Sequence, residues 1–327
     1  MEISVCGMGG VGKTTLVAQV YKSEQIVQNF QWRAWVTVST SFNKDEILKS
    51  IIKELFREKK EMIPQGIDRM DTKGLAEKLH GCLVDQRYLI VLDDVWDVRL
   101  WNEIKDLFDK GIGRIMFTTR NDEIATSLAS SSNHVFKLNP LQDDEASKLF
   151  YSIAFQGDQG GICPKELDVA KEIINKCDGL PLTIVTLGGL LYTKHSAVKW
   201  DNTFKSLNWM LANILQLEGM SNILTFSFHD LPHYLKNCFL YCSVFPEDYP
   251  LKRKMIIRLW IAEGFIQERD RMTMEEIAEQ YLNELVVRNM LQVVQENRYE
   301  HMEVYRMHDI VRQVAILISK KQFLHGT

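Results

Sequence analysis

The segment from Gly7 to Thr14 is the part of this chain that most constrains its fold. Its letters, Gly-Met-Gly-Gly-Val-Gly-Lys-Thr, fit the phosphate-binding pattern G-x-x-x-x-G-K-[ST]. The pattern follows a short apolar run at 3–6 and opens a helix-like stretch at 14–21, which is the order strand, loop, helix. A glycine-rich turn before an ordinary helix is the alternative, but residue usage gives the full pattern in roughly one chain in a hundred of this length. The sequence therefore predicts a site for a nucleoside polyphosphate.

The residue types of this loop suit polyphosphate chemistry. Glycines let successive backbone N–H groups curl around the phosphates, where a Cβ would obstruct them. Lys13 supplies a mobile positive charge for the outer phosphates, and the Thr14 hydroxyl can ligate Mg²⁺. The helix that follows points its positive end at the anion.

Composition limits the class of protein. The 327 residues are 46% hydrophobic and 25% charged, as in an ordinary globular chain with two or three domains. The formal net charge of −4 gives no general attraction to nucleic acid or anionic lipid. The longest apolar run, 180–192, is shorter than the ~20 residues of a membrane span, and we expect no secretory signal. We expect a cytoplasmic protein without a transmembrane segment, which would reach membranes only through other domains or partners.

The six cysteines form no recognisable metal site. Only Cys238 and Cys242 lie close together, and their i, i+4 spacing predicts one buried helix face. No second Cys or His pair has the spacing that would complete a zinc site. We expect reduced thiols in the core.

The first part of the chain alternates strands with helices. The pattern predicts strands at 32–38, 88–92 and 115–119 and helices at 47–56 and 75–83. Residues 59–71, with Pro64 and Gly66, indicate a surface loop. Strands without a polar face, joined by helices, favour a parallel α/β sheet. In such a sheet the chemistry gathers at the carboxyl ends of the strands.

Two carboxylates follow the second of these strands. Asp93 suits the Walker B role of holding Mg²⁺, and Asp94 could orient an attacking water. Considered alone, an Asp-Asp pair after a strand is more often a turn or a helix cap. Beside an intact phosphate loop, the metal role is favoured.

Arg120 follows the third strand and has two interpretations. It could contact the γ-phosphate and sense its presence, or it could be a surface arginine that pairs with Asp122 or Glu123. The sensor is favoured because the preceding strand is apolar and its turn would face the nucleotide.

The remainder of the chain is mostly helical. Apolar spacing predicts helices at 141–154, 169–177, 182–191, 256–262, 277–290 and 309–319. Residues 291–305 indicate a hairpin, the wing of a winged helix. We therefore expect an α/β P-loop NTPase sheet in 1–140, a helical domain in 141–220 and a winged-helix domain in 221–327.

A winged helix raises DNA binding as an alternative. Lys252-Arg253-Lys254 forms a basic cluster at a helix start. The helix that it opens is mostly apolar, so we expect it to be buried rather than to lie in a groove. We interpret the cluster as a solvated first turn and expect no DNA binding.

The ordered motifs resemble one family, the NB-ARC module of plant nucleotide-binding leucine-rich-repeat immune receptors, kin to apoptotic-protease activating factors. The motifs are residues 7–15, the strand 30–38 with Ser39, Leu-Ile-Val-Leu-Asp-Asp-Val-Trp at 89–96, Arg-Ile-Met-Phe-Thr-Thr-Arg-Asn at 114–121, Gly-Leu-Pro-Leu at 179–182, residues 238–248 and Met-His-Asp at 307–309. They run in the family's order across practically the whole chain. Trp96 resembles the coiled-coil subclass rather than the subclass with a Toll/interleukin-receptor-like N-terminus.

The resemblance implies a defence switch with slow ATPase activity at most, resting with ADP and active with ATP. Exchange of the nucleotide would accompany domain rotation and assembly into a homo-oligomer. The helical and winged-helix regions would be the family's ARC1 and ARC2 domains.

The resemblance also implies roles for single residues. Contacts to the nucleotide phosphates and Mg²⁺ would come from Gly9, Gly10, Val11, Gly12, Lys13, Thr14 and Thr15. Asp93 and Asp94 would be the Walker B pair, with Thr14 and Asp93 as Mg²⁺ ligands, and Arg120 would be the γ-phosphate sensor. Pro181 would pack against adenine and His308 would reach the β-phosphate of ADP. Alone, His308 and Asp309 would more often form a helix cap.

Two departures from the family pattern stand out. The sequence starts at the first strand, without the segment that contributes adenine contacts, and stops soon after Met-His-Asp. We expect a fragment or a truncated product that lacks a coiled-coil domain and leucine-rich repeats.

Two other function classes stay open. One is a nucleotide-free scaffold left by truncation. The other is a P-loop enzyme such as a kinase or ATPase, which is less favoured because Asp94 stands where vigorous ATPases commonly have Glu. The nucleotide that copurifies with the chain would separate these classes.

Overall fold

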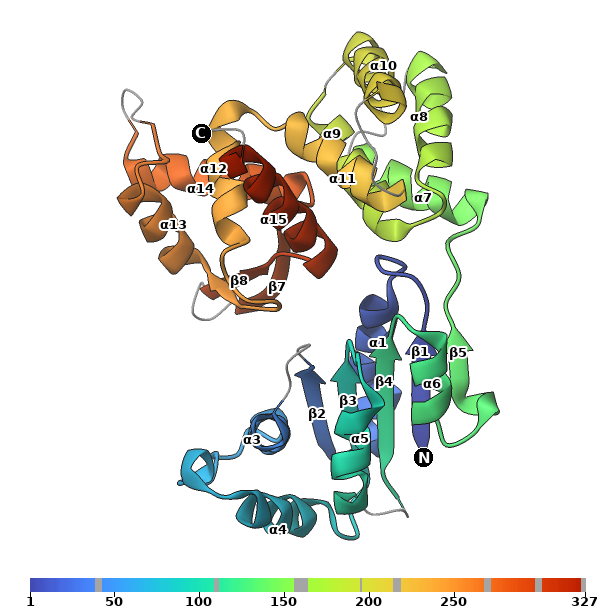
Figure 1. The fold of residues 1–327 in the computed structure, drawn as a ribbon, viewed down its shortest axis with the longest axis vertical. Helices are drawn as coiled ribbons and strands as arrows, with labels where there is room; N and C mark the ends of the chain where they lie inside the picture. The colour runs from blue at the N-terminus through green and yellow to red at the C-terminus, as the bar shows by residue number, and fades with distance from the viewer. Residues whose placement is uncertain are drawn as a thin grey trace. The chain divides into compact units, whose positions relative to one another are not determined.

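The computed structural model describes residues 1–38, 43–108, 112–155, 164–194, 196–213, 219–267, 272–297 and 302–324. They fold into two compact units, Met1–Asn139 and Pro140–Thr327 (Figure 1). Ser39 and the expected hairpin turn at 298–301 lie outside the described residues.

A five-stranded parallel sheet forms the centre of the first unit (Figure 1). Across the sheet the strands are β2 (Trp32–Thr37), β3 (Tyr88–Asp93), β4 (Arg114–Thr119), β1 (Glu2–Cys6) and β5 (Val135–Lys137). All four pairings are parallel, so each connection crosses over the sheet, and helices supply the crossovers. The expected parallel α/β sheet is confirmed.

Helices bury both faces of this sheet. They are α1 (Lys13–Lys22), α2 (Glu24–Asn29), α3 (Lys44–Glu58), α4 (Thr72–Leu83), α5 (Val98–Ile104) and α6 (Asp122–Leu128). On β3, Leu89 and Val91 pack in one core with Val17 of α1, while Ile90 and Leu92 pack in the core that α3, α4 and α5 cover. Burial on both faces explains why this strand is apolar at every position before Asp93.

The expected surface loop at 59–71 contacts the core through two apolar residues, Ile67 and Met70. Ile67–Arg69 forms a turn of 3-10 helix, and Ile67 is only 2% exposed. Lys53 Nζ lies 2.6 Å from Asp68 Oδ1 and ties this turn to α3. The loop prediction was therefore wrong at Ile67, because one fully buried apolar side chain is enough to fasten a loop to the core.

The second unit is mostly helical. Its elements are α7 (Asp143–Ala154), α8 (Pro164–Lys176), α9 (Pro181–Tyr192), α10 (Ala197–Asn213), α11 (Gly219–His229), α12 (His233–Cys242), β6 (Leu251–Lys252), α13 (Arg253–Ala262), α14 (Met274–Val287), β7 (Gln292–Asn297), β8 (Met302–Arg306) and α15 (Asp309–Leu324). Helices α7 to α10 surround one core, and α12 to α15 surround another, beside the antiparallel sheet β6-β8-β7. Helix α11 belongs to both cores, since Ile223 and Phe226 pack in the first and Leu224 and Phe228 in the second.

Helices α9, α12 and α13 are buried as their sequences predict. Helix α9 is buried on nearly every side, and a Cβ on Gly189 would lie 2.4 Å from the Val287 carbonyl oxygen. Cys238 and Cys242 are both buried on α12. The basic cluster opens a helix that packs into the core, and Arg253 forms ion pairs with Glu279 and Glu303.

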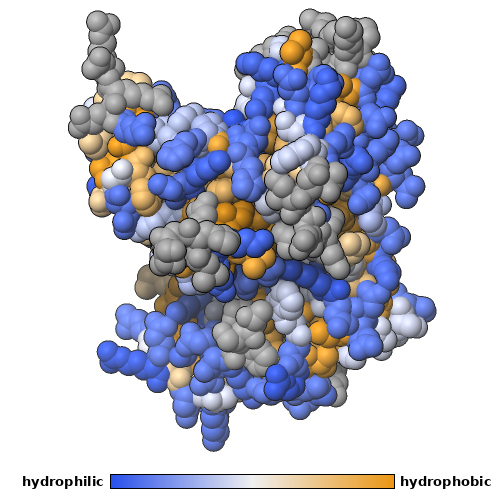
Figure 2. All heavy atoms as spheres, turned by 45° about the horizontal axis from the view of Figure 1, so that its top comes forward, coloured by the Kyte–Doolittle hydropathy of each residue, from blue (hydrophilic) through white to orange (hydrophobic). Residues whose placement is uncertain are grey.

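The described cysteines are free and buried. Burial raises the pKa of both Cys177 and Cys238 to about 12, so these thiols stay protonated and unreactive. The face of the molecule in Figure 2 is largely hydrophilic, interrupted by apolar patches. Within the described ranges, every helix is too short or too polar to cross a bilayer.

Candidate functional site

The phosphate loop connects the end of β1 to the start of α1. Gly7, Gly10 and Gly12 have φ angles of 149°, 75° and 98°, a region that side chains with a Cβ rarely adopt. A Cβ on Gly7 would lie 2.5 Å from the carbonyl oxygen of Leu138, so the loop passes very close to the backbone after β5. Val11 is buried under the loop. The glycines are required by the backbone path itself.

Lys13 is the first residue of α1, and its side chain reaches back to the start of the loop. It is 7% exposed, and its Nζ donates hydrogen bonds of 2.9 Å to the carbonyl oxygens of Gly7 and Met8. Burial lowers the pKa of Lys13, and the positive charge of Arg120 lowers it further. A bound anion would favour the charged form, so the loop holds a partly desolvated cation suited to a phosphate.

Asp93 ends β3 and accepts hydrogen bonds from two hydroxyl groups. The Thr14 Oγ1 and the Thr118 Oγ1 donate to its Oδ1 at 3.0 Å and 2.5 Å. Asp93 is 2% exposed, and hydrogen bonds of this kind offset the cost of burying a carboxylate. Thr118 was missed from the sequence, where the only signal was a polar residue in an apolar strand.

The pair Thr14 and Asp93 fits a magnesium ion. Hydroxyl and carboxylate oxygens are ligands that Mg²⁺ prefers, and it needs few protein ligands because water and phosphate oxygens complete its shell. Among the described residues, no group of three His, Cys, Asp or Glu side chains is placed to hold a metal ion. A site that combines protein and phosphate oxygens agrees with both observations.

Asp94, Trp96 and Arg120 form a cluster beside the loop. The Asp94 Oδ2 accepts hydrogen bonds from Trp96 Nε1 at 3.0 Å and from Arg120 Nη2 at 3.4 Å. The guanidinium carbon of Arg120 lies 4.7 Å from the centre of the Trp96 ring. Asp122, one of the partners considered for Arg120 from the sequence, is bound by Lys137. Arg120 thus pairs with a residue of the predicted site, and its role as a sensor stays a prediction.

Pro181 and His308 belong to the second unit. Pro181 is the first residue of α9, where its missing N–H leaves no hydrogen bond unmade. His308 Nδ1 accepts a hydrogen bond of 3.2 Å from the Ile310 amide at the start of α15, so the neutral ring carries its proton on Nε2. The helix cap considered from the sequence is observed, and the contacts of both residues with a nucleotide stay predictions.

The turn before Pro181 offers a stability test. Gly179 has a φ of 66°, its carbonyl accepts from the Leu141 amide at 2.8 Å, and a Cβ would lie 2.3 Å from the Leu141 oxygen. We expect Gly179→Ala to lower the free energy of unfolding by about 2 kcal/mol, through left-handed strain and a backbone clash. Gly264→Ala is the matched control, since its φ is 72° and nothing lies within 4 Å of its Cβ; it should lose only about 1 kcal/mol. Urea unfolding measures both, and equal losses would contradict the clash.

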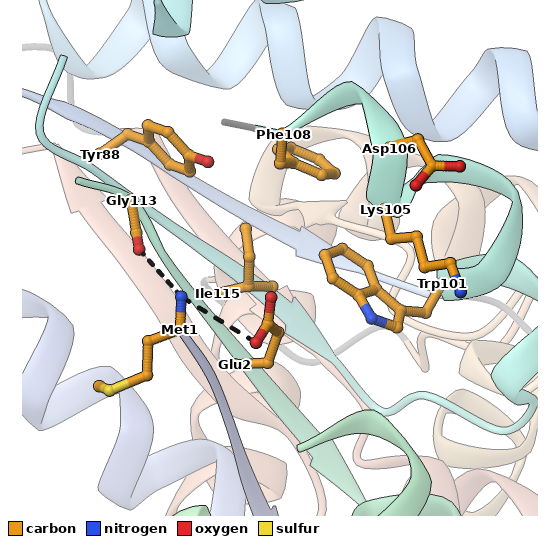
Figure 3. Close-up of a pocket in the computed structure, with 9 residues that line it drawn as sticks. All are labelled: Met1, Glu2, Tyr88, Trp101, Lys105, Asp106, Phe108, Gly113 and Ile115. Atoms are coloured by element: carbon orange, nitrogen blue, oxygen red, sulfur yellow. Dashed lines mark hydrogen bonds and ion pairs between the residues drawn. The ribbon is translucent and has the colours of Figure 1, made fainter. Parts of the chain in front are cut away.

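A cavity of about 290 Å³ lies at the opposite edge of the sheet. Figure 3 shows the aromatic rings of Tyr88, Trp101 and Phe108 around it, with the Met1 ammonium donating to the Gly113 carbonyl at 3.3 Å. These residues come from the amino ends of β1, β3 and β4 and from the segment after β3. The phosphate loop and Asp93 lie at the carboxyl ends, so this cavity is separate from the predicted nucleotide site.

Comparison with known proteins gives the family. The NB-ARC domain model matches residues 2–160, and the disease resistance protein winged helix domain model matches residues 244–315. In Arabidopsis thaliana, disease resistance protein RPM1 is 39% identical over 97% of this chain, and disease resistance protein RPP13 is 36% identical over 98%. This chain belongs to the NB-ARC family of plant disease resistance proteins. It spans about a third of each relative, 35% of RPM1 and 38% of RPP13.

A solved structure confirms the fold of this NB-ARC chain. A signal transduction ATPase with numerous domains and a tetratricopeptide repeat sensor, from Pyrococcus horikoshii, matches with a TM-score of 0.57 at 14% identity. The match covers 96% of this chain and 40% of that protein. The P-loop sheet followed by a helical region and a winged helix is therefore confirmed. Nucleotide binding is implied by the match to the NB-ARC domain. The domain boundaries near residues 140 and 220 stay predictions.

Proposed function

We propose that this chain is the ADP/ATP-dependent switch of a plant intracellular immune receptor, ADP-bound at rest and ATP-bound when it signals defence. The observation that carries the proposal is the convergence of Lys13, Thr14, Asp93 and Arg120 at one end of the sheet, in a chain related to disease resistance proteins. In the full-length receptor, which acts in the cytoplasm, a coiled-coil domain and leucine-rich repeats accompany this module. The active form is a homo-oligomer.

Different residues of the first unit bind the phosphates and the magnesium ion. Loop amides and Lys13 bind the phosphates, with Lys13 exchanging its hydrogen bonds to the Gly7 and Met8 carbonyls for phosphate oxygens. Thr14 and Asp93 hold Mg²⁺, which when bound offsets the negative charge of the phosphates.

Asp94 is held in a way that suits slow hydrolysis. A residue that activates water needs an accessible carboxylate, yet the Asp94 Oδ2 already accepts from Trp96 and Arg120. Its backbone has a φ of 57°, and its amide donates to Thr118 Oγ1 at 2.8 Å, which further fixes its position. A switch that must keep its nucleotide benefits from this restraint.

Arg120 distinguishes the two nucleotides by charge. Its guanidinium is bound to Asp94, so an incoming anion must compete with that carboxylate. Only the terminal phosphate of ATP, which ADP lacks, supplies an anion at this position. The contact is therefore made in the ATP-bound state alone.

Arg120→Ala tests this assignment. We expect the affinity for a non-hydrolysable ATP analogue to fall about tenfold, because one charge-assisted hydrogen bond is lost, while ADP affinity changes little. Isothermal titration of the 327-residue chain with each nucleotide in Mg²⁺ measures the ratio. Arg99→Ala is the control, since Arg99 is highly exposed and pairs with Asp97. Equal losses for both nucleotides would show that Arg120 is not a sensor of the γ-phosphate.

The nucleotide retained on purification separates the proposal from its rivals. Denaturing the purified chain and measuring the released nucleotide should give ADP. Rapid multiple turnover of ATP would instead indicate an enzyme, and a chain without nucleotide or affinity for it would indicate a scaffold.

A further inference from the structure

Trp96 is an exposed tryptophan with a fixed backbone. Its residue surface is 38% exposed, although it follows a buried strand. On one side, the Val95 side chain is buried and its amide donates to the Thr118 carbonyl at 2.8 Å. On the other side, Asp97 caps α5 by accepting from the Arg99 amide at 2.8 Å. The indole is thus presented to solvent from a backbone that is anchored before and after it.

The indole of Trp96 contacts both members of one ion pair. Its Nε1 donates to the Asp94 Oδ2 at 3.0 Å, and its face lies 4.7 Å from the guanidinium carbon of Arg120. Arg120 and Asp94 are themselves only 3.4 Å apart, and both side chains are partly exposed. A single pair at a partly exposed site is weak, so contacts from a third group matter to its geometry. The indole supplies a hydrogen-bond donor to the anion and a cation–π surface to the cation.

We propose that Trp96 is a positioning residue for Arg120 and sets the preference of the site for ATP over ADP. This inference rests on the proposed function, in which Arg120 contacts the terminal phosphate. To make that contact, the Arg120 guanidinium either breaks its hydrogen bond to Asp94 or donates to the carboxylate and the phosphate at the same time. The Trp96 N–H then remains on the Asp94 carboxylate, while the indole face remains beside the guanidinium.

Asp94 loses a hydrogen-bond donor when Arg120 moves to the phosphate. A partly buried carboxylate that loses a donor pays a desolvation penalty, and that penalty opposes the transfer of Arg120 to the phosphate. The Trp96 N–H offsets it by keeping the Asp94 Oδ2 hydrogen-bonded throughout. ADP has no terminal phosphate to bind Arg120, which therefore stays on Asp94. The affinity for ADP then does not depend on the bond from Trp96 to Asp94.

Trp96→Phe isolates the hydrogen bond, because phenylalanine keeps an aromatic face and lacks the N–H. In the 327-residue chain with Mg²⁺, we expect the affinity for a non-hydrolysable ATP analogue to fall about three- to tenfold. The affinity for ADP should stay within about twofold. Trp209→Phe is the matched control, since Trp209 is 59% exposed on α10 and should change neither affinity. Isothermal titration and thermal unfolding of each variant give the ratio and confirm the fold.

An Asp94→Asn background separates positioning from a general structural effect. Asparagine carries no charge and competes weakly for Arg120, so adding Trp96→Phe there should change the ATP-to-ADP affinity ratio by less than about twofold. A merely structural role for Trp96 would lower both affinities, and by the same factor in both backgrounds, which overturns the inference.

The Arg120→Ala variant distinguishes an error in the role of Trp96 from an error in the proposed function. If Arg120→Ala lowers the affinity ratio and Trp96→Phe does not, the role of Trp96 is wrong and the sensor stands. If Arg120→Ala also leaves the ratio unchanged, or if the chain binds neither nucleotide, the sensor and the role of Trp96 fail together.

Discussion

Replacing Lys13 by alanine is expected to lower the affinity for both ADP and ATP by on the order of 100-fold while the chain stays folded. The ammonium lies at the centre of the phosphate loop, where both nucleotides place phosphate oxygens. Its loss also removes one positive charge close to the Asp93 and Asp94 carboxylates, so their repulsion of the phosphates grows. Because burial disfavours the charged form of Lys13, its removal relieves a desolvation penalty, and little stability should be lost.

Isothermal titration with each nucleotide measures this loss, and thermal unfolding without nucleotide checks the fold. Lys22→Ala is the matched control, because Lys22 lies in the last turn of the same helix and is exposed. Wild-type affinity in the Lys13→Ala chain would reject the phosphate loop as the binding site. A large drop in melting temperature would mean instead that Lys13 mainly holds the loop through the Gly7 and Met8 carbonyls.

Much of the fold of the first unit could be predicted because its signals are local. Strands buried on both faces are apolar at most positions, and the phosphate loop fixes the strand before it and the helix after it. The carboxyl ends of parallel strands meet at one edge, so Asp93 and Arg120 were expected near Lys13 without knowledge of the strand order. That convergence is observed, and the chemical roles of the three residues stay predictions.

The contacts between neighbouring strands could not be predicted in the same way. Thr118 reaches Asp93 because β3 and β4 pair with Leu92 opposite Phe117. Register is weakly encoded in strands that are apolar on both faces, since a slip exposes no apolar residue. Trp96 was noticed from the sequence only as a subclass marker, because its contact with Arg120 depends on the same strand pairing.

The first residues of α9 and α15 could be predicted from the local sequence, but their contacts with a nucleotide could not. Proline at the first position of α9 and a histidine cap at α15 are features of a few consecutive residues. Their proposed contact with ADP belongs to the closed state of the whole module, which is a matter of domain arrangement. Variants at α15 therefore test the switch rather than the fold.

Asp309→Val, placed in a full-length receptor that contains this chain, is expected to signal defence without any pathogen. Asp309 is the first residue of α15, directly after the predicted ADP contact His308. A contact made only in the closed state favours that state, so its loss shifts the equilibrium towards the open state. We expect the substitution to displace His308, and the lost hydrogen bond from its ring to a charged phosphate is worth ~1.5–3 kcal/mol, which raises a minor open population about tenfold or more. A cell-death assay in leaves, at matched protein levels, measures the result.

Two further variants decide what such signalling means. Adding Lys13→Ala should silence the Asp309→Val receptor, because the open state still needs ATP and Lys13 is expected to bind its phosphates. Asp143→Val should stay silent, since Asp143 holds the same first position on α7 and its loss removes a helix-start carboxylate without touching the predicted latch. If Asp309→Val is silent, or if Asp143→Val signals equally, the latch at His308 and Asp309 is wrong. The two residues would then serve only to cap α15, which is the contact that the His308 ring already makes with the Ile310 amide.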